Sequence, residues 1–307
     1  MPALADFGAG LEAYNKGNYA AALEEWQPLA KNGDRDAAFY LGVIYADGQG
    51  VQQDLQQAVK WFRLAADHGS PDAQYNLGIA YRSGRGVPND GKEAMRWFQL
   101  AADQGLADAQ LELGAMYMEG EVIPQNYSEA MKWYRLAANQ SNVEAQFALG
   151  ILYAGGYGVP RNYAEAVKWY RLAADQGLPE AQFNLAVAYE KGQGVPENTG
   201  EAMKWYGKAA EQSWVPALNS LALLLATAKD PAIRNPAKAV EYASRAVTLT
   251  EEKEASSLDA LAAAHYANGE LEKAVKSEKQ ALNLSPNQAS YKEHLATYLR
   301  DAAPPAK

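Results

Sequence analysis

The 307-residue sequence contains no cysteine. Disulfides and thiolate metal sites are therefore excluded, and the redox compartment stays open. The sequence also lacks any run of about 18 apolar residues, so we expect no segment that spans a membrane. Its longest apolar cluster, residues 217–226, is too short for that purpose and predicts a buried helix.

Basic residues are in deficit, with 28 Lys and Arg against 37 Asp and Glu and a net charge of −9. Residues 217–307 hold 11 of each sign, so the preceding residues hold 17 basic and 26 acidic side chains. An acidic chain with no basic stripe repels phosphate groups, which argues against nucleic acid and anionic membrane surfaces as partners.

The sequence shows no signal peptide, and Met1-Pro2-Ala3 leads directly into residues of folded composition. An exported bacterial protein without its leader begins in this way, and so does a cytoplasmic one. We expect a periplasmic or secreted bacterial protein, with a cytoplasmic location as the alternative.

A single spacing organises most of the chain. Tryptophans occur at positions 61, 97, 133, 169 and 205, each 36 residues after the last. Leucines from 41 to 221 and tyrosines from 45 to 189 keep the same step. A fixed period of about 20–50 residues is typical of stacked supersecondary units.

Each 36-residue unit has the pattern of two helices. The first helix, as in residues 72–82, carries Ala73, Leu77 and Tyr81 on one face. Gly-x-Gly-Val then predicts a turn, except in the third unit, where Val122 follows Gly120 closely and we expect an unusual loop. The second helix carries the tryptophan, which we assign to the core between helices rather than to a ligand platform. Its expected N-cap residues are Asp54, Asp90, Asn126, Asn162 and Asn198, and it ends at Gly69, Gly105, Ser141, Gly177 and Ser213.

The repeated motif reads A-x-x-x-L-G-x-x-Y-x-x-G-x-G-V, followed by A-x-x-W-Y/F-x-x-A-A-x-x-G. It resembles the Sel-1-like repeat (SLR) family. After residue 214 the period slips, and Leu258, Leu261, Ala262, Gly269, Ala274, Ala281 and Pro286 resemble the related tetratricopeptide repeat (TPR). The resemblance implies an all-α fold, a right-handed α–α superhelix or α solenoid of SLR and TPR helix pairs. It also implies a protein that holds partner proteins.

On this basis we divide one continuous solenoid into five parts. They are an N-terminal TPR-like unit at 3–34, five 36-residue Sel-1-like repeats at 35–214, two TPR-like units at 215–288, a capping helix at 289–300 and a disordered tail at 301–307.

The sequence contains no recognised catalytic motif. The Gly-x-Gly loops join helix to helix and lack the Lys-Ser/Thr that follows a phosphate-binding loop. His68, His265 and His294 lie in different repeats, so we expect no metal site. We therefore expect neither enzyme activity nor a cofactor, with a hydrolase-like activity as a remote alternative.

The inner face of the superhelix is the remaining candidate site. Projected from the TPR pattern, an apolar column comprises Phe39, Tyr75, Leu111, Phe147 and Phe183. An acidic column includes Asp72, Asp108 and Glu144, and two variable columns supply Arg82, Glu119, Glu190 and Lys191. These positions lie opposite the Ala/Leu/Tyr face, so we expect them not to be needed for packing within a helix pair. Alternatively, the acidic residues only complement helix dipoles and the aromatic residues pack on the adjacent repeat.

We predict a non-enzymatic protein–protein interaction scaffold that binds a protein or peptide partner on the concave face. An apolar ribbon edged with carboxylates suits a peptide with basic and apolar residues. Atypical units at both ends favour a monomer. The alternative is a cell-envelope adaptor that binds carbohydrate or peptidoglycan through exposed aromatic residues such as Tyr157 and Tyr163.

Overall fold

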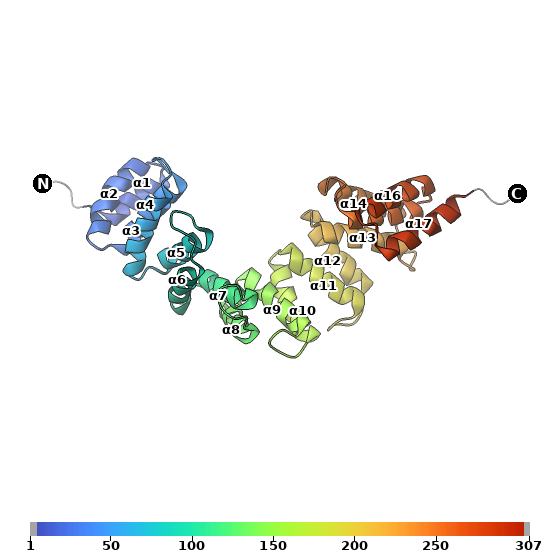
Figure 1. Cartoon of the computed structure of the whole chain (residues 1–307), viewed down its shortest axis with the longest axis horizontal. Helices are drawn as coiled ribbons and strands as arrows, with labels where there is room; N and C mark the ends of the chain where they lie inside the picture. Colours follow the sequence, from blue (N-terminus) through green and yellow to red (C-terminus); the bar gives the residue numbers. More distant parts are fainter. Residues whose placement is uncertain (1–4, 304–307) are drawn as a thin grey trace. The chain divides into compact units, whose positions relative to one another are not determined.

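The computed structural model describes residues 5–303 and contains, within that range, 17 α-helices and no strand (Figure 1). The prediction of an all-α fold is therefore confirmed. In chain order the helices are α1 (Phe7–Asn15), α2 (Tyr19–Lys31), α3 (Arg35–Asp47), α4 (Leu55–Asp67), α5 (Pro71–Ser83), α6 (Gly91–Asp103), α7 (Ala107–Glu119), α8 (Tyr127–Asn139), α9 (Val143–Gly155), α10 (Tyr163–Asp175), α11 (Pro179–Lys191), α12 (Thr199–Glu211), α13 (Val215–Thr227), α14 (Pro236–Leu249), α15 (Ala255–Ala267), α16 (Leu271–Leu284) and α17 (Ala289–Ala302).

The chain divides after Pro160 into two compact units. Unit 1 contains α1 to α9, and unit 2 contains α10 to α17. Within each unit the two helices of a pair pack on each other, and the second helix also packs on the first helix of the next pair. This order of contacts is that of an α solenoid. None of the described helices combines the length and the hydrophobicity that a bilayer span requires.

Side-chain caps define where the second helices begin. The expected column is confirmed, because each member accepts a hydrogen bond from a backbone N–H in the first turn: Asp54, Asp90, Asn126, Asn162 and Asn198. The first helices of the repeats run for 13 residues, as in α5, which is longer than the segment 72–82 expected from its pattern.

Close packing explains the small residues of the repeat. A Cβ on Gly78 would lie 2.4 Å from the ring of Phe98, and one on Gly86 would lie 2.3 Å from the carbonyl oxygen of Leu55. In the third repeat Val122 replaces the second loop glycine and contacts Gly91, where a Cβ would lie 2.6 Å from a valine methyl. In this repeat the loop residue is large and the helix residue that it contacts, Gly91, is small, which is the reverse of the other repeats.

The tryptophan column contributes to the core, as expected. Trp97 and Trp205 are buried, and Trp61, Trp133 and Trp169 are half-buried. Trp26, in the N-terminal pair, is fully buried and stacks on Phe7 and Tyr40.

A column of buried glutamines, which the sequence analysis missed, fixes how successive pairs stack. Gln74, Gln110, Gln146 and Gln182 each donate from the side-chain amide to the carbonyl eight residues earlier. The side-chain oxygens of Gln74, Gln110 and Gln182 accept from a glutamine 30 residues later, Gln104, Gln140 and Gln212 respectively. Because both the donor and the acceptor are satisfied, the amide is buried without an unpaired group.

The segment after residue 214 keeps the helix-pair plan with different connections. The starts of α13 and α15 are 40 residues apart, four more than in a 36-residue repeat: one extra residue lies in the loop between α13 and α14, one in α14 and two in the loop between α14 and α15, so the α13–α14 loop does not account for the slipped period alone. The last helix, α17, runs to Ala302, so the capping helix is two residues longer than the predicted 289–300 and includes the first residues of the predicted tail. Residues 304–307 of that tail lie outside the described residues.

Candidate functional site

The predicted apolar column is divided between the two units. Phe39, Tyr75, Leu111 and Phe147 lie on α3, α5, α7 and α9 of unit 1, and Phe183 lies on α11 of unit 2; all are half-buried. The ring centroids of Phe39 and Phe62 are 5.9 Å apart, those of Tyr75 and Phe98 5.8 Å, and those of Phe183 and Tyr206 5.6 Å.

Each of these contacts joins the two helices of one pair, so the expectation that the column is not used within a pair is wrong. An aromatic ring at this position reaches the large aromatic side chain on the second helix of the same pair. That second ring also packs against the glycine of the first helix, as Phe98 does against Gly78. The exposed part of each side chain remains available to a ligand.

The predicted charged residues differ in their surroundings. Asp72, Asp108 and Glu144 are exposed in the first turns of α5, α7 and α9, where a carboxylate also complements the helix dipole. Asn142 donates to Asp108 over 3.1 Å.

The remaining predicted charges lie near the C-terminal ends of first helices. Arg82 pairs with Glu112 on the next first helix of unit 1, a partner that the sequence analysis did not select. Glu190 accepts a hydrogen bond from the Tyr206 hydroxyl over 2.7 Å. Glu119 and Lys191 are exposed.

Unit 1 has a small pocket of about 190 Å³ between α3, α4 and α5. Its lining includes Ala46 on α3 and Ile79 on α5, together with Asp47 and Arg85. Two successive first helices therefore contribute to one pocket.

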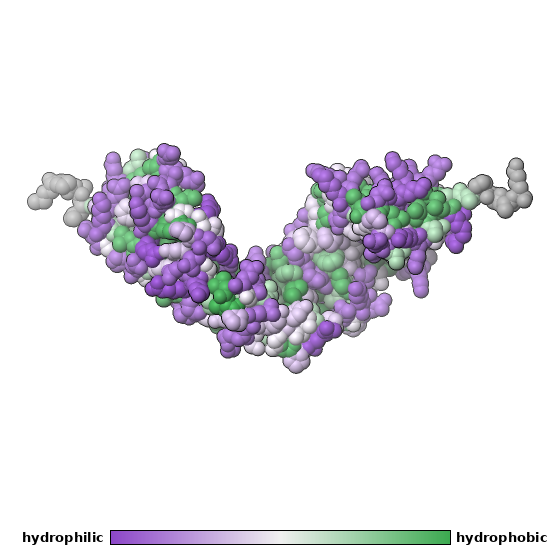
Figure 2. All heavy atoms as spheres, in the orientation of Figure 1, coloured by the Kyte–Doolittle hydropathy of each residue, from purple (hydrophilic) through white to green (hydrophobic). Residues whose placement is uncertain are grey.

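Unit 2 has a larger cavity of about 670 Å³. Most of its lining comes from three successive first helices, α13, α15 and α17. The walls are mainly apolar, with Leu223, Ala263 and Leu271, while Arg234 and Asp301 supply charge. Figure 2 shows a largely hydrophilic surface interrupted by apolar patches, one of them over these C-terminal helices.

Beside this cavity the structure brings together three side chains that the sequence placed in separate segments. Asp259 lies on α15, Glu278 on α16 and His294 on α17. Nδ1 of His294 is 2.7 Å from a carboxylate oxygen of Asp259 and 3.9 Å from one of Glu278. His294 also lines the cavity and stacks on Tyr298. Among the described residues this group has the composition of a metal site.

Glu278 is fully buried, and neither of its carboxylate oxygens has a hydrogen-bond donor. Burial, followed by the nearby Asp259 carboxylate, raises the pKa of Glu278 to about 8. Burial and the same two carboxylates also raise the pKa of the Tyr298 hydroxyl. The cluster therefore has an excess of acidic groups over donors.

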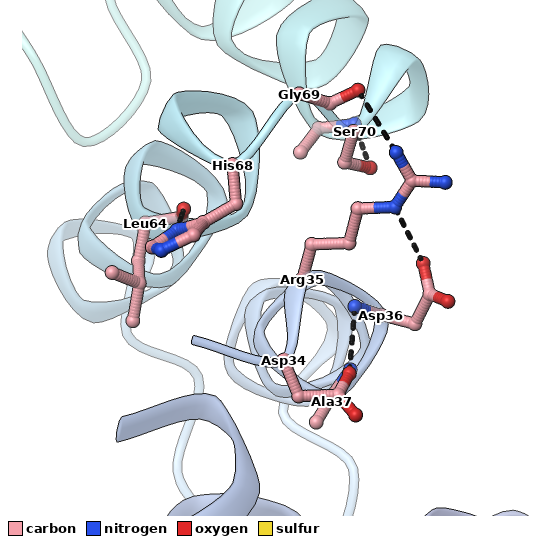
Figure 3. Close-up of polar contacts among 9 residues, drawn as sticks. Asp34, Arg35, Asp36, Ala37, Leu64, His68, Gly69 and Ser70 are labelled. Carbon is pink, nitrogen blue, oxygen red and sulfur yellow. Dashed lines mark hydrogen bonds and ion pairs between the residues drawn. The ribbon is translucent and has the colours of Figure 1, made fainter. Parts of the chain in front are cut away.

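The other two histidines have local partners. Figure 3 shows the His68 ring turned back onto its own helix, where Nδ1 is 2.8 Å from the Leu64 carbonyl oxygen. In the same region Arg35, at the start of α3, reaches the Gly69 carbonyl at the end of the same repeat. His265 lies 2.5 Å from Glu270.

The two tyrosines of the carbohydrate alternative lie in different units. Tyr157 is exposed, and its ring centroid is 5.2 Å from that of Tyr127. Tyr163, the first residue of α10, is half-buried, and the Arg161 guanidinium lies 5.9 Å from its ring centroid.

The architecture and its repeated motif define a class of protein, the helical-repeat solenoids. Within that class the chain belongs to the Sel1 repeat family: the family model matches six consecutive repeats at residues 35–70, 71–106, 107–142, 143–178, 179–214 and 215–250. The sixth match covers a segment that the sequence analysis assigned to a TPR-like unit. Proteins of this family are generally protein-interaction scaffolds.

Two solved structures show the same similarity. The protective antigen c5321 of uropathogenic Escherichia coli, which has an SLR fold, is 32% identical with a TM-score of 0.84 over 97% of this chain. The chain spans 66% of the length of that protein. A Sel1 repeat protein from Oxalobacter formigenes is 30% identical with a TM-score of 0.74, over 81% of this chain and all of its own. No curated protein sequence matches the chain.

Proposed function

We propose that the protein is a non-enzymatic scaffold that binds protein or peptide partners on the inner faces of its first helices. The cavity of unit 2 carries this proposal, because it lies between three successive first helices and has a volume of about 670 Å³. Ligand pockets of about 300–1,000 Å³ with apolar walls and a few polar groups are typical binding sites. An apolar side chain of a partner fits these walls.

Unit 1 supports the same proposal through its own surface. Half-buried apolar residues on α3, α5, α7 and α9 lie near exposed carboxylates at the starts of three of these helices. Such a surface favours an extended or helical segment that carries both apolar and basic residues. The Arg82 end of its pair with Glu112 is exposed, so a partner's carboxylate can reach the guanidinium.

The test is selection of displayed random peptides on the full chain, followed by affinity measurements with purified peptides. We expect the selected peptides to combine apolar residues with Lys or Arg. Thr227→Arg introduces a bulky positive charge at the rim of the unit 2 cavity, and Leu111→Lys does the same on the apolar column of unit 1. Each is expected to weaken binding at its own unit by at least about tenfold, or about 1.4 kcal/mol.

The chain offers a matched control for each variant. Thr248 on α14 is exposed and bonds its own helix four residues back, as Thr227 does. Leu136 on α8 is an exposed leucine of a second helix. Thr248→Arg and Leu136→Lys should therefore change affinity by less than about twofold. Equal losses in the test and control variants would show that the inner faces are not the binding surfaces.

A further inference from the structure

The group formed by Asp259, Glu278 and His294 has no role in the packing scheme of the repeats. Its three ligand atoms, one from each side chain, lie within 4.8 Å of one another, and each side chain comes from a different helix. This convergence holds one imidazole nitrogen and two carboxylates at a distance that a single ion can bridge.

Glu278 gives a second, independent observation that this group can take a ligand. Its side chain is fully buried, and no donor reaches either oxygen. A buried carboxylate without donors is costly, because it has lost its water and gained nothing in return. Its neighbours include the Asp259 carboxylate and the phenols of Tyr291 and Tyr298. The imidazole of His294 lies 3.9 Å from Glu278, beyond hydrogen-bond distance, and its Nδ1 is 2.7 Å from Asp259 instead.

We propose that Asp259, Glu278 and His294 bind one divalent first-row transition-metal ion, with Zn²⁺ as the reference ion. Imidazole and carboxylate oxygen together suit Zn²⁺, Mn²⁺ and Fe²⁺, whereas Mg²⁺ and Ca²⁺ prefer oxygen ligands alone. Such an ion would supply both the charge and the coordination that the Glu278 oxygens lack.

The site also has the access that binding requires. The side chain of His294 is 43% exposed, while those of Asp259 and Glu278 are 14% and 0% exposed. Three protein ligands leave at least one coordination position for water or for a group from a partner.

The ion would join α17 to α15 and α16. Because α15 and α17 both line the cavity of unit 2, metal binding would also fix the walls of that cavity. This consequence rests on the proposed function, whereas the metal site itself does not.

The experiment is a calorimetric titration of the chelator-treated full chain with Zn²⁺, repeated with Co²⁺ and read by visible absorption. We expect one equivalent per chain and a rise in melting temperature with added ion. Glu278→Gln keeps the shape of the side chain and removes the buried charge, and His294→Ala removes the exposed ligand. Each should weaken binding beyond the roughly 10–100-fold that loss of an outer-shell partner costs.

His265→Ala is the matched control, because His265 also contacts a carboxylate but only one, that of Glu270. This variant should bind the ion as the wild type does, and circular dichroism checks the fold of all three variants. No saturable binding by the wild type would overturn the proposal. So would unchanged binding in either folded ligand variant, or Ca²⁺ competing equally with Zn²⁺. None of these readouts involves a peptide, so failure here is distinguishable from failure of the proposed function.

Discussion

The repeats at residues 35–214 and the helices after Trp214 bury polar side chains in contrasting ways. In four of the five repeats, a buried glutamine of the first helix donates to a backbone carbonyl, as Gln110 does to Ala102. In α15 to α17, the buried Glu278 meets a second carboxylate and no donor. The first arrangement is neutral and satisfied, and the second is ionisable and unsatisfied.

The difference separates a structural role from a binding role. A satisfied amide network contributes a fixed stacking register and needs nothing further. An unsatisfied carboxylate persists at a cost to stability, which is typical of sites that hold a ligand. The following predictions test whether the two regions differ in this way.

The largest expected effect is a change in the stability of the C-terminal helices with pH, measured with a chelator present. The unfolded carboxyl releases its proton near pH 4.5, whereas folded Glu278 keeps it up to a pH of about 8 because its pKa is raised. The unfolded state therefore binds fewer protons in this window, and stability falls as the pH rises through it. The slope is at most about 1.4 kcal/mol per pH unit, or on the order of 5 kcal/mol across the whole shift.

Hydrogen exchange of the α16 amides between pH 5 and pH 8.5 measures this local stability. Glu278→Gln does not titrate, so its corrected protection should change far less over the same range. If the two proteins respond alike to pH, Glu278 is not the titrating group and the contrast between the regions fails.

A smaller effect is expected when the glutamine column is broken. Gln110→Leu fills similar space but leaves the Ala102 carbonyl without its side-chain donor and removes the acceptor for Gln140. Loss of a buried partner costs about 1–3 kcal/mol, so we expect about 2 kcal/mol, seen as a lower denaturation midpoint.

Gln99→Leu is the control for this change. Gln99, on α6, is half-buried, and its side chain bonds Asp103 on the same helix rather than a buried carbonyl, so the effect should stay within about 0.5 kcal/mol. A Gln110 variant as stable as the Gln99 variant would mean that the column does not hold the stack together.

The periodicity of the sequence predicted the fold because the two helices of each repeat pack on each other through the same residue types at the same positions. Alternating small and large residues, such as Gly78 facing Phe98, mark both helices and their close approach within a single repeat. The N-cap residues, such as Asn126, are equally local, so their positions could be read directly from the sequence.

The candidate sites were less accessible to sequence reasoning because they depend on contacts between repeats. Glu278 and His294 are 16 residues apart on different helices, and only the fold brings both to Asp259. Gln110 is one of four glutamines spaced 36 residues apart, from Gln74 to Gln182, so the column was visible as a pattern. What was missed was its meaning, which follows from burial of an amide beside a backbone carbonyl.

The smallest effect tests how the repeats join the C-terminal region. Ser141 and Ser213 hold φ angles of +66° and +64°, a left-handed conformation that favours glycine. Ser141→Gly should therefore raise stability by about 0.5–1 kcal/mol, measured by thermal denaturation. Ser213 differs because its hydroxyl accepts a hydrogen bond of 2.7 Å from Arg245 on α14. Ser213→Gly would lose that link, so its gain should be smaller than the gain at Ser141. Equal gains would show that the Arg245 contact contributes nothing to the junction between the repeat that ends at Trp214 and α14.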